Sequence, residues 1–574
     1  MKFLARVALL SLIFFFLSFS LNAQTKEDVE NDFKNGKIVE ASKKVEEACK
    51  LNKDDHKFLI LCGDIFAELD DLEQALVYYK MAKKAKKRDM EVVLRLGRTL
   101  CELGQTEEGM EYLIDAIEDY DENIEPLLEL AYVHLKDLNF KEARKNINKA
   151  KELDDSDVRV YLAFGDMYYK NGIYQLAIDN YKQALLIDPD NLEVRKNLAS
   201  SYYWSANRET VNQDLANELF KQSLKEWNTL TQKDSTNADG WFGKGKILFL
   251  SKKYSNAAKS LYHYVKLRPN GKLGRWMYAQ SLYEVNACDS AAPQLDWVID
   301  NIDSVKSKAS FMLARCYHKI GDYDKAIAQY TSIKDQELPI KDLRRLASSY
   351  LKSGDTTNWI LTYDIAIKKE PESFCKVMKM IGQIYMRDKE YIRATDYFKM
   401  KLSYNKCNEK DEGRTNYLTG LSYLYGKELD SAKTYFNNAI IINPNDLNSK
   451  VYMADLYAKT GETDSSISKF KEIIEFAGKD TLKYKKELKS AFGKFCGMLF
   501  KEKMFTELIE YAKLWSQLQP NIDLGYLYVG VGYQSRAKTA EDADYQNACK
   551  WYKKTIEINP KNKTANKSII NLGC

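Results

Sequence analysis

Histidine, glycine and serine motifs give little support for catalysis in this 574-residue chain. The four histidines, His56, His134, His263 and His318, lie far apart and form no His-x-x-x-His pair. A catalytic or metal site needs several titratable groups in one place, so this spacing predicts neither. Gly243–Lys246 is too short for a phosphate-binding loop, and no Gly-x-Ser-x-Gly motif occurs. We therefore expect no catalytic residues, no metal site and no cofactor.

Aromatic and basic side chains offer recognition as the remaining chemistry. The chain has 39 tyrosines and 8 tryptophans, and its 87 basic and 82 acidic residues give a net charge of +5. This near balance provides no general attraction for nucleic acid, which we do not expect as a partner. A charged partner has to meet a local patch, and the position of that patch depends on the elements that present it.

Small residues recur at intervals of 34 along much of the chain. Gly63, Gly97, Ala131, Gly165 and Ala199 follow this spacing, and further alanines or glycines occur twelve and nineteen residues after the first four of them. A fixed period of this length indicates a stack of similar units instead of one compact core.

The unit that begins near residue 158 shows why each repeat should form two helices. Its apolar residues between 157 and 170 recur at three and four positions, which is helical periodicity, and Gly172 supplies a left-handed residue that ends the helix. A second helix is expected over 174–187. Gly165 is small enough to allow the two helices to approach closely, and we expect Tyr181 to fill the gap beside it.

This unit resembles the tetratricopeptide repeat family, whose pattern combines small residues, aromatic residues, alanines and a proline at fixed offsets. The residues that meet the pattern here are Gly165, Tyr168, Ala177, Tyr181, Ala184 and Pro189. On that register, 15 units begin near residues 22, 56, 90, 124, 158, 192, 238, 272, 307, 340, 375, 413, 447, 489 and 523. The resemblance implies an all-α, right-handed superhelical solenoid of about fifteen helix-turn-helix repeats.

The spacing departs from the repeat in two places, where extra polar residues follow Tyr202 and Tyr533. Insertions in such arrays map to loops on one face, either as tolerated loops or as binding elements. The first insertion also suggests a boundary between subarrays near 205–237. The expected organisation is a signal peptide over 1–23, an N-terminal array over 24–204, an insertion and long turn over 205–237, a C-terminal array over 238–560, and a closing helix and tail over 561–574.

The chain begins with a pattern typical of an export signal. Lys2 and Arg6 form a short positive region before an apolar run over Val7–Leu21, and Ala23 provides a small residue for cleavage. The run is shorter than the roughly 20 residues of a spanning helix. We expect export to the periplasm or cell envelope, or secretion, with no transmembrane segment after signal removal; a retained N-terminal anchor is the alternative.

Ten cysteines follow the signal without a Cys-x-x-Cys pair. On the repeat register, Cys375 and Cys407 lie at the same end of one unit, and Cys49 and Cys62 lie on adjacent helices of neighbouring units. An oxidising compartment would allow both pairs to form disulfides, and free thiols are the alternative.

In the tetratricopeptide repeat family, the first helices of successive units line a concave groove with positions 2, 5, 9, 12 and 13 of each unit. The aromatic residues at these positions that we expect to contact a partner are Tyr169, Tyr203, Trp204, Phe242, Trp276 and Phe311. The basic residues are Lys308, Arg315, Lys341, Arg344, Lys352, Lys376, Lys379 and Arg387.

An aromatic stretch beside a basic stretch suits an extended protein or peptide segment with apolar anchors and acidic residues. The resemblance therefore implies a non-catalytic interaction scaffold. Three alternatives remain: aromatic residues that pack between units, basic residues on a solvated face, and a carbohydrate- or cell-wall-binding module in which Trp204 and Trp276 stack on sugars.

One activity of the family is not implied. Its carboxylate clamp for chaperone C-termini requires asparagine at positions that hold Asp64, Arg98, Tyr132 and Asp166 in this chain.

Overall fold

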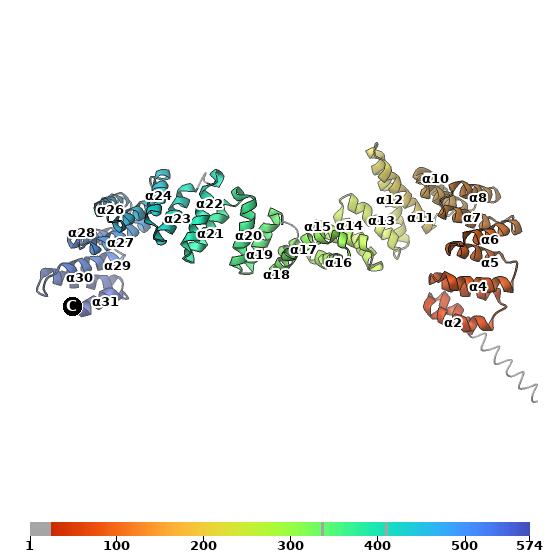
Figure 1. The fold of residues 1–574 in the computed structure, drawn as a ribbon, viewed down its shortest axis with the longest axis horizontal. Coiled ribbons are helices and arrows are strands. Elements are labelled where there is room, and N and C mark those ends of the chain that lie inside the picture. Colours follow the sequence, from red (N-terminus) through yellow and green to blue (C-terminus); the bar gives the residue numbers. More distant parts are fainter. Residues whose placement is uncertain (1–24, 334–337, 408–410) are drawn as a thin grey trace, which may run out of the picture. The chain divides into compact units, whose positions relative to one another are not determined.

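The computed structural model describes residues 25–333, 338–407 and 411–574, and the predicted signal peptide over 1–23 lies outside them. All regular structure in these ranges is helical (Figure 1). The chain divides into two compact units, one ending at Cys316 and one beginning at Tyr317. The boundary suggested near 205–237 therefore falls inside the first unit.

The first unit is built from consecutive antiparallel helix pairs. A helix over residues 25–34 is followed by α2 (Ile38–Leu51), α3 (His56–Glu68), α4 (Leu72–Ala85), α5 (Met90–Glu102), α6 (Thr106–Asp119), α7 (Ile124–Lys136), α8 (Phe140–Leu153), α9 (Val158–Lys170), α10 (Tyr174–Ile187), α11 (Leu192–Arg208), α12 (Gln213–Lys233), α13 (Ala238–Leu250), α14 (Tyr254–Leu267), α15 (Lys272–Glu284), α16 (Cys288–Asn301) and η1 (Asp303–Val305). Helix α17 (Lys306–Ile320) runs from the first unit into the second.

The second unit continues the same pattern. Its elements are α18 (Tyr323–Ser332), α19 (Ile340–Lys352), α20 (Thr356–Lys369), η2 (Pro371–Ser373), α21 (Cys375–Arg387), α22 (Tyr391–Leu402), η3 (Asn405–Cys407), α23 (Glu412–Tyr425), α24 (Leu429–Ile442), α25 (Leu447–Lys459), α26 (Thr463–Gly478), α27 (Lys485–Lys501), α28 (Phe505–Leu518), α29 (Asp523–Arg536), α30 (Ala543–Ile558) and α31 (Lys563–Leu572). The odd-numbered helices from α3 to α29 begin at or close to the predicted starts of the repeats, so the all-α solenoid is confirmed within each unit.

Close approach of the two helices in a repeat depends on glycine, as predicted for Gly165. A Cβ atom on Gly165 would lie 2.4 Å from the ring of Tyr181, which is fully buried. The equivalent contact one hundred and two residues earlier joins Gly63 to Tyr79 at 2.3 Å. A larger side chain at either glycine would displace the tyrosine ring. The aromatic residue of the second helix therefore requires glycine at the facing position of the first helix.

Helix starts follow the capping residues of the sequence. The side chains of Asp55, Asp89, Asn123, Asp157 and Asn191 each accept a hydrogen bond from a backbone N–H in the first turn of the helix that follows. These bonds satisfy donors that a helix N-terminus otherwise leaves unpaired, and they recur with the repeat.

The turn between the two helices has a left-handed residue in most repeats, those that begin near 192 and 523 excepted. Glycine takes this conformation at Gly104, Gly172 and Gly354, with φ of 83°, 73° and 84°. At seven equivalent turns the described chain carries another residue with φ between 54° and 66°: Asp70, Leu138, Lys252, Asn286, Lys389, Lys427 and Lys503. The backbone geometry of the repeat is therefore kept even where the sequence lacks the residue that adopts it most easily.

The segment over 205–237, expected to be an insertion and long turn, is largely helical. Helix α11 continues to Arg208 and has 17 residues, and α12 has 21, whereas α9 and α10 have 13 and 14. Because Trp227 and Leu230 are buried against the neighbouring repeats, the extra residues lengthen both helices instead of forming a loop. Helix α12 can be followed in Figure 1.

Disulfides join neighbouring helices in both units. The expected pairs Cys49–Cys62 and Cys375–Cys407 are confirmed as disulfides. Two further disulfides, Cys288–Cys316 and Cys549–Cys574, were not predicted from the sequence. The second of these ties α30 to the residues that follow α31, the predicted closing helix.

Two cysteines, Cys101 and Cys496, are buried free thiols. Burial raises the pKa of the Cys496 thiol to about 12, so this side chain stays protonated and behaves as a small apolar residue. None of the helices in the described part of the chain combines the length and apolarity needed to cross a membrane.

Candidate protein-binding groove

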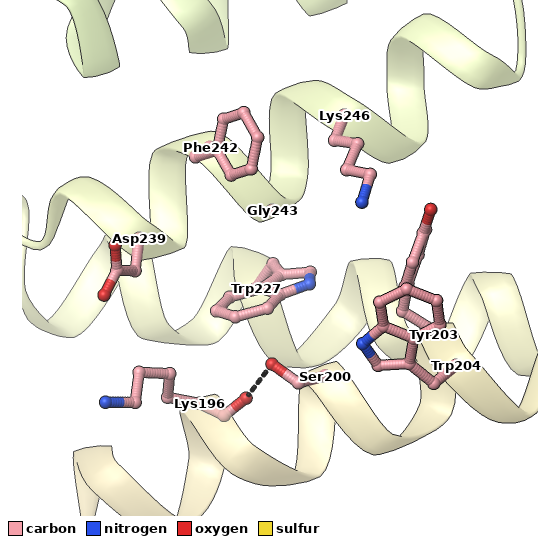
Figure 2. Close-up of a pocket in the computed structure, with 9 residues that line it drawn as sticks. All are labelled: Lys196, Ser200, Tyr203, Trp204, Trp227, Asp239, Phe242, Gly243 and Lys246. Atoms are coloured by element: carbon pink, nitrogen blue, oxygen red, sulfur yellow. Dashed lines mark hydrogen bonds between the residues drawn. The ribbon is translucent and has the colours of Figure 1, made fainter. Parts of the chain in front are cut away.

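Helices α11, α12 and α13 enclose a pocket of about 280 Å³ in the first unit (Figure 2). Its lining is Lys196, Ser200, Tyr203, Trp204, Trp227, Asp239, Phe242, Gly243 and Lys246. All but Trp227 and Gly243 occupy groove positions of the two repeats that begin at 192 and 238. The structure therefore brings the predicted contact residues Tyr203, Trp204 and Phe242 to one site.

The floor of the pocket is the indole of Trp227, which is only 6% exposed. Gly243 makes this possible, because a Cβ atom at that position would lie 2.3 Å from the Trp227 ring. The glycine of the Gly243–Lys246 stretch thus has a packing role beneath a pocket.

Aromatic contacts extend from one side of the pocket toward the preceding repeat. The ring centroids of Tyr203 and Trp204 are 5.3 Å apart, and Trp204 stacks on Tyr174 at 6.5 Å. Tyr169 meets Tyr174 edge-on at 5.5 Å. The predicted contact residue Tyr169 therefore supports this aromatic cluster and does not line the pocket.

Positive charge dominates the mouth of the pocket. The Lys246 ammonium lies 4.2 Å from the centroid of the Tyr203 ring and 5.6 Å from that of Trp204. The single carboxylate in the lining, Asp239, forms an ion pair with Arg268 at 3.0 Å. Within the described residues, neither Lys196 nor Lys246 has a carboxylate within ion-pair distance.

Two further predicted aromatic residues pack more deeply. Trp276 is buried and the Lys308 ammonium lies 5.6 Å from its ring, so the alternative of packing between units applies to this tryptophan. Phe311 is half-buried, with the Arg315 guanidinium 5.8 Å from its ring. Lys308 is exposed.

The predicted basic stretch of the second unit separates into two groups. Lys341, Lys352 and Lys376 are exposed, and no carboxylate among the described residues lies within ion-pair distance of them. Arg344 is also exposed and lies 4.7 Å from the centroid of the Phe374 ring. These four cations are available to a partner from helices α19 and α21.

The other two cations are already paired. Lys379 donates to Asp411 at 2.5 Å, and Arg387 contacts Asp388 at 3.0 Å. Asp411 lies beyond the helix pair that carries Lys379, at the start of α23. Lys379 therefore joins successive repeats and contributes little net charge to the groove.

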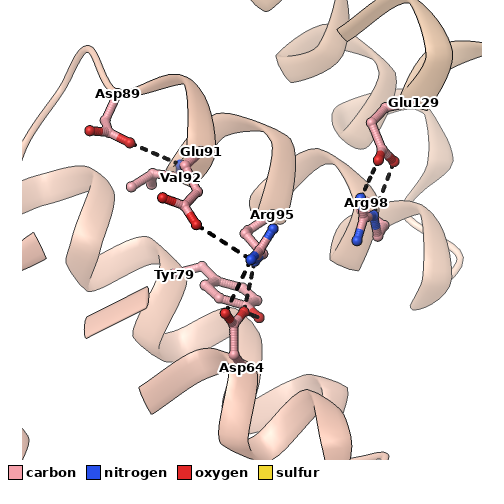
Figure 3. Close-up of polar contacts among 8 residues, drawn as sticks. All are labelled: Asp64, Tyr79, Asp89, Glu91, Val92, Arg95, Arg98 and Glu129. Atoms are coloured by element: carbon pink, nitrogen blue, oxygen red, sulfur yellow. Dashed lines mark hydrogen bonds and ion pairs between the residues drawn. The ribbon is translucent and has the colours of Figure 1, made fainter. Parts of the chain in front are cut away.

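A series of polar pairs along the first helices of the first unit was not predicted (Figure 3). Arg95 donates through Nε to Asp64 at 2.7 Å, and Arg98 donates through Nε to Glu129 at 3.0 Å. In both pairs the partners are 31 residues apart, which joins position 9 of one repeat to position 6 of the next. That constant separation is the signal by which the sequence could have revealed them.

Asp166 is the centre of the same arrangement two repeats later. Its carboxylate accepts hydrogen bonds from the Tyr181 hydroxyl at 2.5 Å, from the Tyr132 hydroxyl at 3.1 Å and from the Asn197 amide at 3.1 Å. Burial raises the pKa of Asp166 above its usual value, while the tyrosine hydrogen bonds oppose that shift. The positions of a carboxylate clamp are thus used here to connect three repeats.

We expect Asp166→Ala to lower the free energy of unfolding by about 1–3 kcal/mol, because two buried hydroxyls and an amide lose their acceptor. Asp166→Asn keeps one accepting oxygen and should lose less. Asp179→Ala, an exposed carboxylate on α10, serves as the matched control with an effect near zero. Urea unfolding followed by circular dichroism measures all three, and equal losses for the alanine and asparagine variants at 166 would contradict the assigned role.

Histidines do not gather at any of these places. His318 bonds to the Ser349 hydroxyl at 2.9 Å, and His263 stacks on Trp241 at 4.3 Å between centroids. Across the ranges that the structure describes, no group of histidine, cysteine and acidic side chains is arranged to hold a metal ion.

Helix pairs stacked in series, with a pocket between first helices, define a helical-repeat interaction scaffold. Residues 165–203 match the family model of the TPR repeat, and residues 277–337 match that of the tetratricopeptide repeat. These matches show tetratricopeptide repeats in the two segments, and the helix pairs on either side of them repeat the same architecture. Proteins of this family are generally non-catalytic and bind peptide or protein partners.

Several solved structures are similar to parts of the chain. A tetratricopeptide repeat protein from Parabacteroides merdae is 15% identical, with a TM-score of 0.35, over 46% of this chain and 98% of its own. YrrB, described as a TPR protein with an unusual peptide-binding site, is 19% identical, with a TM-score of 0.28, over 34% of this chain and 93% of its own. A chain of the APC/C hetero-tetramer Cut9–Hcn1 is 12% identical, with a TM-score of 0.31, over 90% of this chain and 96% of its own. No curated protein matches the sequence.

Proposed function

We propose that this protein is a non-catalytic scaffold of the cell envelope that holds an extended segment of a protein partner in its groove. The pocket between α11 and α13 is the observation that carries this proposal, because aromatic side chains and two lysines converge there. The partner segment has apolar side chains for the pocket and acidic side chains for the lysines.

The exposed cations of the second unit support the acidic character of the partner. Lys341, Lys352 and Lys376 are solvated and have no ion-pair partner among the described residues. Carboxylates from a bound segment would gain charge-assisted hydrogen bonds there without displacing an existing pair.

The four disulfides support export from the cytoplasm. Disulfides form and persist in oxidising compartments and are rare in the cytosol. Eight of the ten cysteines are paired in this chain, which accords with the export signal expected at its N-terminus.

A carbohydrate-binding module is the second candidate, and exposed Trp204 favours it. The Trp204 indole is 38% exposed at the side of the pocket, as a sugar-stacking platform would be. The second platform expected for this function, Trp276, is only 9% exposed. The peptide function is therefore the better supported of the two.

The test replaces three exposed groove cations in a single variant, Lys341→Glu, Arg344→Glu and Lys376→Glu. Lys379 is left unchanged, because its reversal would place a carboxylate beside Asp411. Crosslinking in the native cell, followed by mass spectrometry, should recover at least about tenfold less partner from the variant, equivalent to roughly 1.4 kcal/mol.

The matched control makes the same charge change on second helices, with Lys80→Glu, Lys149→Glu and Lys368→Glu, all exposed. Equal recovery from both triple variants would argue against the basic groove. Glycans, and no protein, bound to the wild-type chain in a parallel array would favour the carbohydrate alternative.

A further inference from the structure

From the geometry we infer that the α11–α13 pocket takes one large apolar side chain of the partner, whose neighbouring carboxylate is held by Lys246. The inference rests on the proposed function and specifies the chemistry of the segment at that site. It predicts a partner motif in which an aromatic or large aliphatic residue stands beside an acidic one.

The size of the pocket sets the number of groups that it can hold. Pockets that enclose whole small-molecule ligands measure about 300–1,000 Å³. At about 280 Å³, this pocket lies just below that range, so it suits one large side chain projecting from an extended segment.

The inner surface is apolar and closely packed. Trp227 forms the floor at 6% exposure, Phe242 stands above it, and Tyr203 and Trp204 form one side (Figure 2). An apolar side chain that replaces water on these rings gains the burial energy of its own surface, and an aromatic one adds ring contacts.

The charges at the mouth select against cations. The aromatic faces that would attract a ligand cation already hold the chain's own Lys246, 4.2 Å from Tyr203. Asp239, which could have attracted a cation, is engaged by Arg268. Lys196 adds a second positive charge. A carboxylate next to the apolar anchor is therefore the complementary group, and half-burial of Lys246 strengthens its attraction.

In three of the preceding repeats, a charged groove residue is already paired. Asp64, Arg98 and Asp166 occupy groove positions of those repeats, and each is already satisfied by a neighbouring repeat. A segment crossing them would have to break an existing pair to gain a new one.

The probe is a fluorescein-labelled peptide with the central sequence Glu-Phe-Glu between Gly-Ser flanks, titrated with the full-length mature protein and followed by anisotropy. Saturable binding is expected. Peptides with Glu-Ala-Glu or Lys-Phe-Lys centres should bind at least about tenfold more weakly, because they lose the anchor or reverse the charge. Absence of saturable binding of the Glu-Phe-Glu peptide at about 1 mM protein, or equal binding of all three, would overturn the inference.

Protein variants assign the two halves of the motif. Lys246→Gln should lower the affinity for the Glu-Phe-Glu peptide about tenfold, to that for a Gln-Phe-Gln peptide. The four affinities form a double-mutant cycle, which measures the coupling between Lys246 and the peptide carboxylates. Trp204→Ala should weaken both peptides. Lys259→Gln makes the same charge change at an exposed position of the second helix α14 and should leave both affinities unchanged.

Cellular crosslinking distinguishes failure of the inferred pocket chemistry from failure of the proposed scaffold function. If cellular crosslinking recovers the same partner equally from wild type, Lys246→Gln and Trp204→Ala, the pocket chemistry is wrong while the scaffold function stands. If crosslinking recovers no protein partner from the wild type, the proposed function itself is wrong.

Discussion

Replacement of Trp515 by alanine is expected to lower the free energy of unfolding of the second unit by about 3–5 kcal/mol. The Trp515 side chain on α28 is fully buried and stacks on Phe492 with centroids 5.5 Å apart. Its Nε1–H donates to Gln519 at 2.9 Å, and Gln519 in turn donates to the Lys485 carbonyl at 2.8 Å. The substitution therefore leaves both a cavity and an unpaired buried amide oxygen.

Urea unfolding with circular dichroism and tryptophan fluorescence measures this loss. Trp204→Ala is the matched control, since the same indole is removed from a position that is 38% exposed, and we expect it to lose about 1 kcal/mol or less. Similar losses for the two variants would mean that Trp515 does not have the packing role described for it.

Loss of the Cys375–Cys407 disulfide is expected to have the second largest effect, about 2–4 kcal/mol. The bridge spans 32 residues and joins the start of α21 to η3, beyond α22. Without it, the unfolded chain gains conformational freedom across that repeat. The double variant Cys375→Ser, Cys407→Ser should show this loss when unfolded in urea without reductant.

Reductant provides the complementary measurement. It should destabilise the wild type more than the double variant, because the variant has one disulfide fewer to lose. Cys101→Ala, which removes a buried free thiol, should lose the same amount with and without reductant. Alkylation of more than two cysteines in the unreduced protein would contradict the assigned pairing.

The sequence was sufficient for most of the fold because the repeat itself determines which residues are buried. The predicted positions of Gly165 and Tyr181 are confirmed, and the closing helix expected within 561–574 is present over Lys563–Leu572. The segment over 205–237 differed for a physical reason. Its polar composition suggested a loop, but Trp227 and Leu230 face the core at helical spacing and hold α12 together.

The site was predicted in part, because a repeat register gives the face of a helix and not the depth of a side chain. Tyr203, Trp204 and Phe242 meet at one pocket as the register predicts, whereas Trp276 at an equivalent position is buried. Lys379 was counted as a groove cation, since its pairing with Asp411 depends on how two repeats stack.

The seven left-handed turns that lack glycine are positions at which a substitution could stabilise the array. A non-glycine residue in the left-handed conformation costs about 1–2 kcal/mol. Glycine would remove that cost, but the greater freedom of glycine in the unfolded chain would cancel roughly half of the gain. Leu138 and Lys252, with φ of 54° and 56°, are two of the seven non-glycine residues in this conformation. The turns lie outside the α11–α13 pocket lining, so glycine could be introduced at them one by one to set the melting behaviour of the array independently of its ligand.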